Sequence, residues 1–287
     1  MSNIETIQRL YADNPRLCHA SNIIGKYRDR KTTASQKSAL EAIMVKYITY
    51  IQQVLNINTY DDDAIKHKVE CLNTYYNYIH NAGYDNIFKS QSKFRPTILE
   101  EFMYLLLKDI LNDKKTLYDR NDKLASGSVK AYTNLFFKPN SLETFVKKAE
   151  IGINEKDQDY AIYRTFQLSI DGKKGTNIRV PAVAVEVKTY IDKTMLDSII
   201  ATAEKLKSGN PYTLFIAVAE WYDVSTKVDP SYSRIDQIYV LRKGKHKGAW
   251  NEIDANIVLR VFNNIATHLE KPWSDVKRRL EEDGIII

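Results

Sequence analysis

Two charged residues stand near the end of an apolar run at Arg179–Ile191. The run reads RVPAVAVEVKTYI, and its valines and alanines predict a central strand that is buried on both faces. Glu186 and Lys188 are two positions apart, so both side chains leave the same face of that strand. Burying a carboxylate and an ammonium beside a sheet core is costly unless they are paired or bind something. The pair therefore indicates a binding or catalytic site.

A second strand is expected to bring acids to this pair. Tyr160–Ile170 has the β-branched and aromatic composition of a strand, and the DGKKGTN segment at 171–177 has turn chemistry. Folding this hairpin places the start of the first strand beside the end of the second. Asp157 and Asp159 occupy that start. The hairpin thus predicts that Asp159 meets the Glu-x-Lys pair at one end of two antiparallel strands.

Two carboxylates beside a lysine suit hydrolysis of a phosphodiester. Hard oxygen ligands bind Mg²⁺, which prefers one or two carboxylates together with a substrate phosphate. The metal lowers the pKa of a bound water and neutralises charge on the phosphate. The lysine can hold the attacking water and contact the scissile phosphate. The alternative is an ordinary salt bridge of Lys188 with Glu186 or Asp159 at the rim of a sheet.

An acid followed by a hairpin that ends in E-x-K resembles the PD-(D/E)xK nuclease superfamily. The chain departs from the literal pattern, because Gln158 rather than proline precedes Asp159 and Lys156 precedes Asp157. The tripeptide is a weak signal by itself, since D-x-K also begins at Asp29, Asp113, Asp171 and Asp275. Among these matches, the one at Glu186 closes a buried apolar run and follows a strand that begins with acids.

The surrounding elements fit the same core. Phe94–Asn112 carries an apolar stripe at helical spacing, and Lys193–Lys207 followed by Tyr212–Glu220 predicts a helix and a strand parallel to the E-x-K strand. In the superfamily a helix before the sheet often lends an acid to the site. By this resemblance Glu100 is the candidate and Glu101 the alternative, while both acids could also simply favour the start of a helix.

The predicted fold is therefore α/β, with a mixed central sheet, a restriction-endonuclease-like αβββαβ core and an N-terminal helical region. We assign residues 1–90 to a helical region that contacts DNA or forms a dimer, and residues 91–287 to the nuclease core with C-terminal helices. Residues 112–140 are polar and rich in turn formers, which predicts loops with a short element at 129–137. An edge strand is expected at Ile235–Leu241 and an amphipathic helix at Glu252–Leu269.

Two basic segments could bind phosphates, although either could equally be a solvated connector. One is a predicted loop at 25–37 and the other a predicted turn at 242–248. The net charge of +6 agrees mildly with a polyanionic partner. The candidate DNA-binding residues in these segments are Lys26, Arg28, Arg30, Lys31, Lys37, Arg242, Lys243 and Lys245.

Composition excludes several other classes. Two cysteines are too few for a disulfide framework, and the sequence contains no long apolar run, no signal peptide and no phosphate-binding glycine motif. We therefore expect a cytoplasmic protein without membrane association.

A closer resemblance rests on EVKTYIDKTML at 186–196 and FRPTILEEF at 94–102, which are similar to type II restriction endonucleases of the BbvCI and DdeI kind. It implies Mg²⁺-dependent cleavage of double-stranded DNA at a short specific site, 5′-phosphate ends, the bacterial cytosol, and action as a homodimer or as a heterodimer with a related subunit. Asp159 and Glu186 would bind Mg²⁺ with the Val187 carbonyl, and Lys188 would orient the attacking water. The alternative is a non-catalytic DNA-binding protein or a non-specific repair nuclease on the same core.

Overall fold

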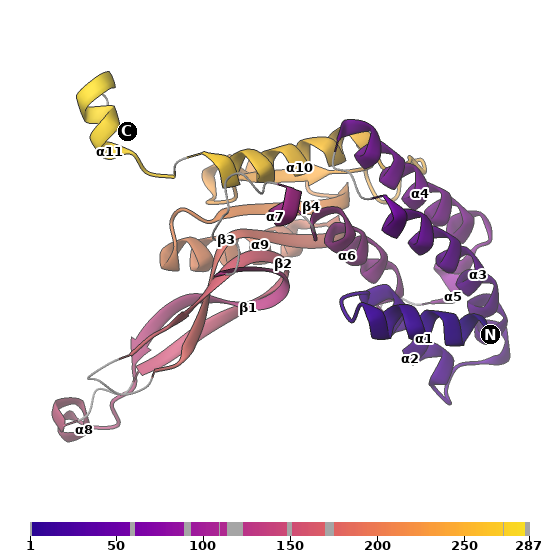
Figure 1. Ribbon diagram of the computed structural model, residues 1–287, viewed down its shortest axis with the longest axis horizontal. Helices are drawn as coiled ribbons and strands as arrows, with labels where there is room; N and C mark the ends of the chain where they lie inside the picture. Colours follow the sequence, from indigo (N-terminus) through magenta and orange to yellow (C-terminus); the bar gives the residue numbers. More distant parts are fainter. Residues whose placement is uncertain are drawn as a thin grey trace.

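A five-stranded mixed sheet of order β1-β2-β3-β4-β5 forms the centre of the structure (Figure 1). β1 pairs antiparallel with β2 and β2 with β3, whereas β3, β4 and β5 run parallel. The strands are β1 (Leu124–Phe137), β2 (Ile151–Gln167), β3 (Asn177–Ile191), β4 (Leu214–Tyr222) and β5 (Gln237–Val240). The computed structural model describes residues 2–57, 61–88, 93–108, 110–113, 123–147, 151–169, 175–271 and 273–284.

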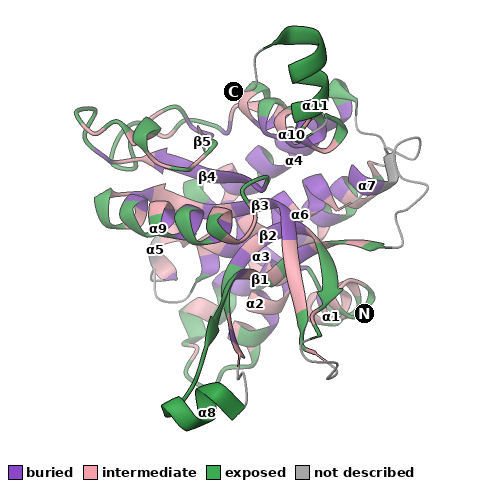
Figure 2. Ribbon diagram, turned by 90° about the vertical axis from the view of Figure 1, so that its left-hand side faces the viewer, coloured by how far each residue is buried: buried purple, intermediate pink, exposed green. Residues whose placement is uncertain are grey.

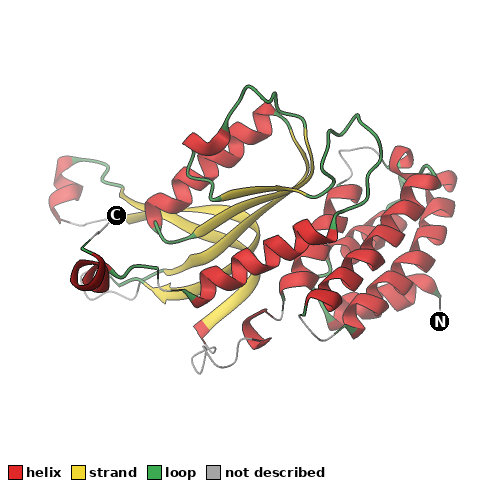
Figure 3. Cartoon of the chain, turned by 90° about the horizontal axis from the view of Figure 1, so that it is seen from above, coloured by secondary structure: helices red, strands yellow, loops and turns green. Residues whose placement is uncertain are grey.

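Helices gather to one side of the sheet and also cover its faces (Figure 3). They are α1 (Asn3–Asp13), α2 (Cys18–Arg28), α3 (Ala34–Asn56), α4 (Asp62–Asn81), α5 (Tyr84–Ile87), α6 (Phe94–Leu107), α7 (Ile110–Asp113), α8 (Leu142–Lys147), α9 (Lys193–Gly209), α10 (Ala255–Glu270) and α11 (Val276–Arg278). Local chemistry sets several starts: Thr33 and Gln36 form a capping box before α3, and the Asp192 carboxylate accepts from Met195 N–H at the start of α9.

The sheet separates two apolar layers. Val183, Val185 and Val187 of β3 pack into a core that includes residues of α6, α10 and the N-terminal helices. Ala184 lies on the opposite face, in a core that includes the apolar side of α9. This alternation follows from the two-residue repeat of a strand, and the middle of β3 and nearly all of β4 are buried (Figure 2).

The predicted αβββαβ core is confirmed, because α6, β1, β2, β3, α9 and β4 follow one another in that order. The predicted strand at Tyr212–Glu220 corresponds to β4, and the edge strand to β5. The turn residues 171–174 lie outside the described residues.

Two strands are longer than the sequence predicts. β1 begins at Leu124 rather than 129, and β2 begins at Ile151 rather than Tyr160. Most of the additional residues are small, polar or charged, which is typical of loops in a single sequence. Residues 151–158 pair with residues 129–137 of β1 along an exposed two-stranded ribbon, and residues 124–127 pair with residues 161–164 of β2. α8 caps the far end of this ribbon, away from the body of the molecule (Figure 1).

The N-terminal helices and the sheet share one hydrophobic core. Buried residues of α1 to α4 belong to the same core as the β3 valines, and the Asn73 side chain of α4 donates to Ile253 O, 2.9 Å away, just before α10. The division at residue 90 stays a prediction. No helix in the described part of the chain is long and apolar enough to span a membrane.

Candidate active site

The site lies where β2 and β3 part. Their pairing runs from Gln167 opposite Asn177 to Tyr160 opposite Val185. Beyond that pair the register of β2 continues with β1, and that of β3 continues with β4. Asp159 and Glu186 are the first residues past the last β2–β3 pair, one on each side of the fork.

A bulge in β2 directs Asp159 toward β3. Gly127 of β1 lies opposite Ala161 and Val129 opposite Gln158, so the two residues Asp159 and Tyr160 share one partner position. Bulges of this kind bend a strand and redirect a side chain. Asp159 Oδ2 accepts a hydrogen bond of 2.7 Å from Val187 N–H across the fork. The carboxylate thereby replaces the strand carbonyl that the parting of β2 and β3 removes.

Lys188 joins the two acids. Its Nζ lies 2.7 Å from Glu186 Oε1, 3.5 Å from Asp159 Oδ2 and 3.1 Å from the Val187 carbonyl oxygen. The structure therefore brings together Asp159, Glu186 and Lys188, as the hairpin predicts. The three side chains are 28%, 15% and 29% exposed, which leaves the cluster open to a substrate.

Glu100 of α6 belongs to the same electrostatic cluster. Burial, followed by the negative charge of Asp159, raises the pKa of Glu100 to about 7, although Lys188 and Lys93 oppose the shift. Glu186 has a pKa that is raised chiefly by burial. The carboxylates therefore repel one another in a partly buried space.

Glu101, the alternative to Glu100, has a structural role. It is 1% exposed, and its carboxylate accepts from Tyr47 O–H at 2.9 Å and from the backbone N–H groups of His19 and Ala20 at 2.8 and 3.2 Å. These bonds connect α6 to α2 and α3. Adjacent helical residues point in directions about 100° apart, so one acid reaches the fork while its neighbour lies between helices.

A cavity of about 510 Å³ adjoins the acids. It opens between the α1–α2 linker, α6 and the β1–β2 ribbon, and it is lined by Pro15, Arg16, Cys18, Glu100, Tyr104, Ser128, Val129, Lys130, Asp157, Gln158 and Asp159. Asp157 is exposed in this cavity, whereas Asp159 bonds to β3. The contacts thus favour Asp159 over Asp157 as the acid nearest to Lys188.

The first basic segment is not a loop. α2 continues to Arg28 and α3 begins at Ala34, because the Thr33 capping box ends the connector early. The Lys26 ammonium lies 5.6 Å from the centre of the Phe88 ring. The other four candidates in the segment are exposed, namely Arg28, Arg30, Lys31 and Lys37.

The prediction that Arg242 of the second basic segment binds DNA is wrong. The Arg242 side chain is fully buried, ion-paired with Glu220 at 2.7 Å and bonded to the Asn251 carbonyl. Trp250 packs against its guanidinium, whose central carbon is 4.1 Å from the ring centre. Arg242 therefore cannot reach a DNA phosphate in this structure, because the charge that looks solvated in the sequence is enclosed by aromatic rings.

The rest of that segment is accessible. Lys243 and Lys245 are exposed, and Lys243 forms an ion pair with Asp254. His246 stacks on Tyr190, two residues beyond Lys188, with ring centres 5.0 Å apart. This contact holds the basic turn beside the carboxyl-terminal end of β3.

Sequence reasoning did not find Arg16 in the cavity. Arg16 lies in the short linker between α1 and α2, in a DNPRLC context that has no periodicity and no cluster of charge. A single arginine in a connector carries no signal until the fold shows what it faces.

The metal ligands were tested against the geometry of the described residues. Among these, no three or more His, Cys, Asp or Glu side chains form a ready metal cluster. The oxygens proposed for Mg²⁺ nevertheless converge, since Asp159 Oδ2, Glu186 Oε1 and Val187 O all lie within 3.5 Å of the Lys188 ammonium. Hard oxygen donors gathered around one positive charge are the donor set that a divalent cation requires.

Comparisons with known proteins agree with this arrangement. A family model described as Bpu10I restriction endonuclease matches residues 91–250, more than half of the 287-residue chain. The chain therefore belongs to the Bpu10I restriction endonuclease family, whose enzymes bind DNA and hydrolyse it at a specific site, generally with a divalent metal.

A solved structure, the native BbvCI A2B2 tetramer, has the same fold. It matches with a TM-score of 0.67 and 19% sequence identity, over 90% of this chain and 98% of that chain. The comparison with curated proteins gave no match. The predicted fold and the enzyme class, a site-specific endodeoxyribonuclease, are thus confirmed, while the roles of individual residues remain proposals.

Proposed function

We propose that this chain is a catalytic subunit of a type II restriction endonuclease that cuts double-stranded DNA with Mg²⁺ and leaves 5′-phosphate ends. The observation that carries the proposal is the convergence of two carboxylates and a backbone carbonyl on Lys188 at the β2–β3 fork. Family membership supplies the reaction class.

Asp159 and Glu186 would hold the metal, with the Val187 carbonyl as a further ligand. When bound, the ion would lower the pKa of a water and neutralise charge on the phosphate. The β2 bulge and the Val187 N–H hold Asp159 toward β3, so that the carboxylates are positioned before substrate arrives.

Lys188 is proposed to orient the attacking water. Burial alone would lower the pKa of this ammonium, but the charges of Asp159 and Glu186 outweigh burial and raise it. Without a metal, Lys188 is therefore an ammonium. We propose that it acts as a hydrogen-bond donor toward water and the scissile phosphate.

Glu100 completes the site from the α6 side. Its carboxyl lies on the wall of the cavity with Asp159, and the charges of Asp159 and Glu186 raise its pKa in addition to the effect of burial. We propose that Glu100 hydrogen-bonds water at the metal site, a role that an acid on a packed helix can fill without a loop movement.

Two groups of cations, all exposed except the half-buried Lys26, are proposed to bind the DNA backbone. They comprise Lys243 and Lys245 on the turn held by Tyr190, and the α2–α3 cations Lys26, Arg28, Arg30, Lys31 and Lys37. Replacing Lys245 with alanine is expected to weaken binding uniformly across sequences and to reduce the salt dependence of the binding constant by about one counterion. An unchanged slope in a binding titration over salt concentration would argue against that contact.

A second subunit is proposed because the chain carries one such site among its described residues and duplex cleavage needs two. The BbvCI structure is an A2B2 tetramer, which supports either a homodimer or a heterodimer with a related subunit. Residues 1–90 are the proposed DNA-contacting or dimerisation region.

A plasmid digest tests the proposal. The purified chain, incubated with supercoiled plasmid and Mg²⁺, is expected to give discrete fragments or, if a different partner subunit is required, a site-specific nick. Asp159→Ala and Lys188→Ala are each expected to lower the cleavage rate by at least about 10²- to 10³-fold, the scale for losing one positioned charge stabiliser. Duplex binding in EDTA should remain. Near-normal cutting by either variant, or a smear of random products, would refute the assignment.

A further inference from the structure

Arg16 occupies a fixed position on the wall of the catalytic cavity opposite the acids. The linker that carries it is short and anchored on both sides. Asn14 Oδ1 accepts from Arg16 N–H at 3.3 Å and from Tyr104 O–H at 3.1 Å, while Leu17 is fully buried. The backbone at Arg16 is therefore held by α6, the helix that also supplies Glu100.

The guanidinium reaches from the helical region to the sheet. Arg16 Nη1 donates a 3.0 Å hydrogen bond to the Ser128 carbonyl of β1. Ser128 is the residue opposite the β2 bulge at Asp159 and Tyr160. A bulge disrupts the ladder locally, and the arginine bonds to the carbonyl at that position. Arg16 and Asp159 are thus connected through the β2 bulge opposite Ser128.

Gly127 provides the space for this contact. Its φ of +127° lies in a region that disfavours other residues, and a Cβ there would come within 3.0 Å of the Arg16 guanidinium carbon. The close approach of the strand to the arginine therefore depends on glycine at this position.

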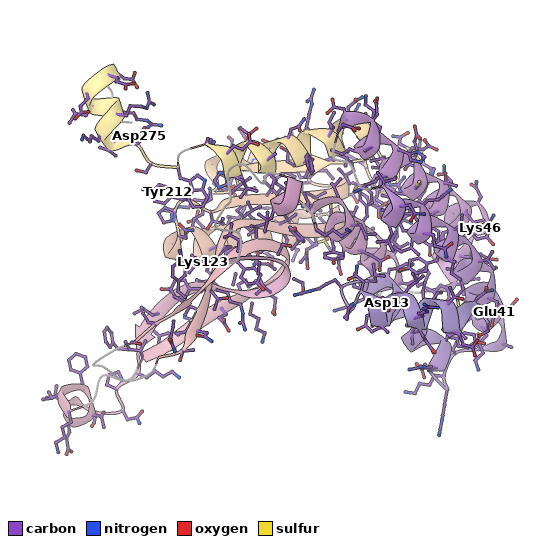
Figure 4. All side chains as sticks on the ribbon, in the orientation of Figure 1. Asp13, Glu41, Lys46, Lys123, Tyr212 and Asp275 are labelled. Carbon is purple, nitrogen blue, oxygen red and sulfur yellow. The ribbon has the colours of Figure 1, made fainter. Side chains whose placement is uncertain are left out.

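Part of the donor capacity of Arg16, which lines the cavity, is not used by the described residues. A guanidinium has five N–H donors, and one of its nitrogens is used by Ser128. Within the described residues Arg16 forms no ion pair of 4.0 Å or less, although Asp157, Asp159 and Glu100 line the same cavity. Figure 4 shows side chains extending into the space between Asp13, at the end of α1, and the β1–β2 ribbon. A fixed, exposed arginine beside a proposed phosphodiester-cleaving centre is complementary to a phosphate.

We propose that Arg16 is a positioning residue that binds a backbone phosphate of the cleaved strand next to the scissile one, while its bond to Ser128 keeps the site-forming bulge in register with that phosphate. This inference rests on the proposed nuclease function and adds a substrate contact from the helical region. Lys130, also on the cavity wall, lies opposite Asp157 in register and has a neighbouring acid. Arg16 is therefore the stronger phosphate ligand.

The first test measures duplex binding in EDTA, where no cleavage occurs. Arg16→Ala is expected to weaken binding about ten- to a hundredfold, the scale of one charge-assisted hydrogen-bonded contact, and to reduce the salt slope by about one. Arg16→Lys should recover part of the affinity because it keeps the charge. Arg260→Ala, which removes an exposed arginine of α10 outside the cavity and outside residues 1–90, is the matched control and should bind like the unaltered chain.

The second test locates the phosphate. Duplexes carrying one neutral methylphosphonate at successive positions around the mapped cut are titrated with the unaltered chain and with Arg16→Ala. One position is expected to weaken the unaltered chain by the same factor as the substitution and to have no further effect on Arg16→Ala. Equal losses for both proteins at every position would overturn the proposal and leave Arg16 as a structural tie.

Further measurements distinguish a loss of DNA binding caused by unfolding from a loss caused by the missing phosphate contact. Urea unfolding of Arg16→Ala and Arg16→Lys identifies any loss caused by instability, and a stable Arg16→Lys variant keeps the test decisive. The salt slope on any duplex requires no cleavage. An enzyme that cuts normally but shows no Arg16 dependence therefore refutes this inference alone, whereas a chain that never cuts but shows the dependence refutes the nuclease proposal alone.

Discussion

Two charged clusters lie at the carboxyl ends of the adjacent parallel strands β3 and β4, and they differ in charge balance. At β3, the carboxylates of Glu100, Asp159 and Glu186 lie in one electrostatic cluster, in which the Lys188 ammonium bonds to Asp159 and Glu186. At β4, Glu220 is fully buried and bonds to Arg242 and Arg95 at 2.7 and 3.0 Å.

The acids and guanidinium groups of the β4 cluster are paired with one another, although Arg242 Nη2 is buried without a hydrogen-bond partner among the described residues. Asp85 pairs with Arg95 at 2.9 Å, so two acids meet two guanidinium groups. Trp221 and Trp250 pack over both arginines. Every charge there has an internal partner and an aromatic cover, which is the arrangement that a buried ion pair needs.

The charges of the β3 cluster are not balanced within the cluster. Its carboxylates outnumber the cation that bonds to them, Lys188, and a cavity of about 510 Å³ adjoins it, whereas the cavity of about 350 Å³ beside the β4 cluster is lined by the paired Arg95 and Asp85. An excess of buried negative charge costs stability unless a cation binds. The cluster with unbalanced charge is therefore the proposed site for a metal and a phosphate, and the charge-balanced cluster is not.

The largest expected effect is a difference in the free energy of unfolding between substitutions in the two clusters. Glu220→Gln removes the carboxylate that both arginines share, and it should lower the free energy of unfolding by about 3–5 kcal/mol, the cost of breaking a buried pair. Asp159→Asn keeps an acceptor for Val187 N–H in a partly exposed site, so its loss should stay below about 1 kcal/mol. Urea denaturation measures both. Equal destabilisation would show that the two clusters are structurally equivalent.

A smaller effect contrasts Glu101 with its neighbour Glu100. Burial raises the pKa of Glu101 from 4.5 to about 7. In the folded state the proton is therefore retained up to about pH 7, while the unfolded chain ionises near its ordinary value. The resulting stabilisation is fully present below pH 4.5 and is lost as pH rises through about 7, in total about 3 kcal/mol.

Glu101→Gln should remove this part of the pH dependence and leave cleavage intact. The amide can still accept from the N–H groups of His19 and Ala20 and can donate to Tyr47 O–H. Urea unfolding at pH 5 and pH 8, with a cleavage assay alongside, checks both points. Loss of cleavage in a stably folded Glu101→Gln protein would contradict the division of roles between these acids.

The smallest expected effect concerns the cation at the centre of the β3 cluster. The Lys188 ammonium contacts the three oxygens proposed as metal ligands. Lys188→Met removes this competing charge, so Ca²⁺ affinity without DNA should rise about tenfold, or about 1.4 kcal/mol. Isothermal calorimetry measures it. Lys193→Met, which breaks an exposed pair with Asp197 on α9, is the control. An unchanged affinity would indicate that the metal does not use these oxygens.

Much of the fold follows from local patterns. Burial imposes repeats of 2 and 3.6 residues on the sequence. These repeats predict the valine-rich strand β3, the amphipathic helices α3, α4, α6 and α9, and the order of elements in the core. The same logic marked Glu186 and Lys188, since a charge inside an apolar strand departs from its local repeat. The full length of the exposed β1–β2 ribbon could not be predicted from the sequence, because paired polar strands in solvent show no such repeat.

Contacts between distant segments decided the rest. The choice between Glu100 and Glu101 depended on which side of α6 meets β2 and which meets α2 and α3. The burial of Arg242 depended on tryptophans at 221 and 250 and a tyrosine at 76. The amino-acid sequence alone thus determined which elements form and where a charge is anomalous, because those are properties of single helices and strands. Which charges share a site was decided by tertiary packing, since electrostatic partners need be close only in space.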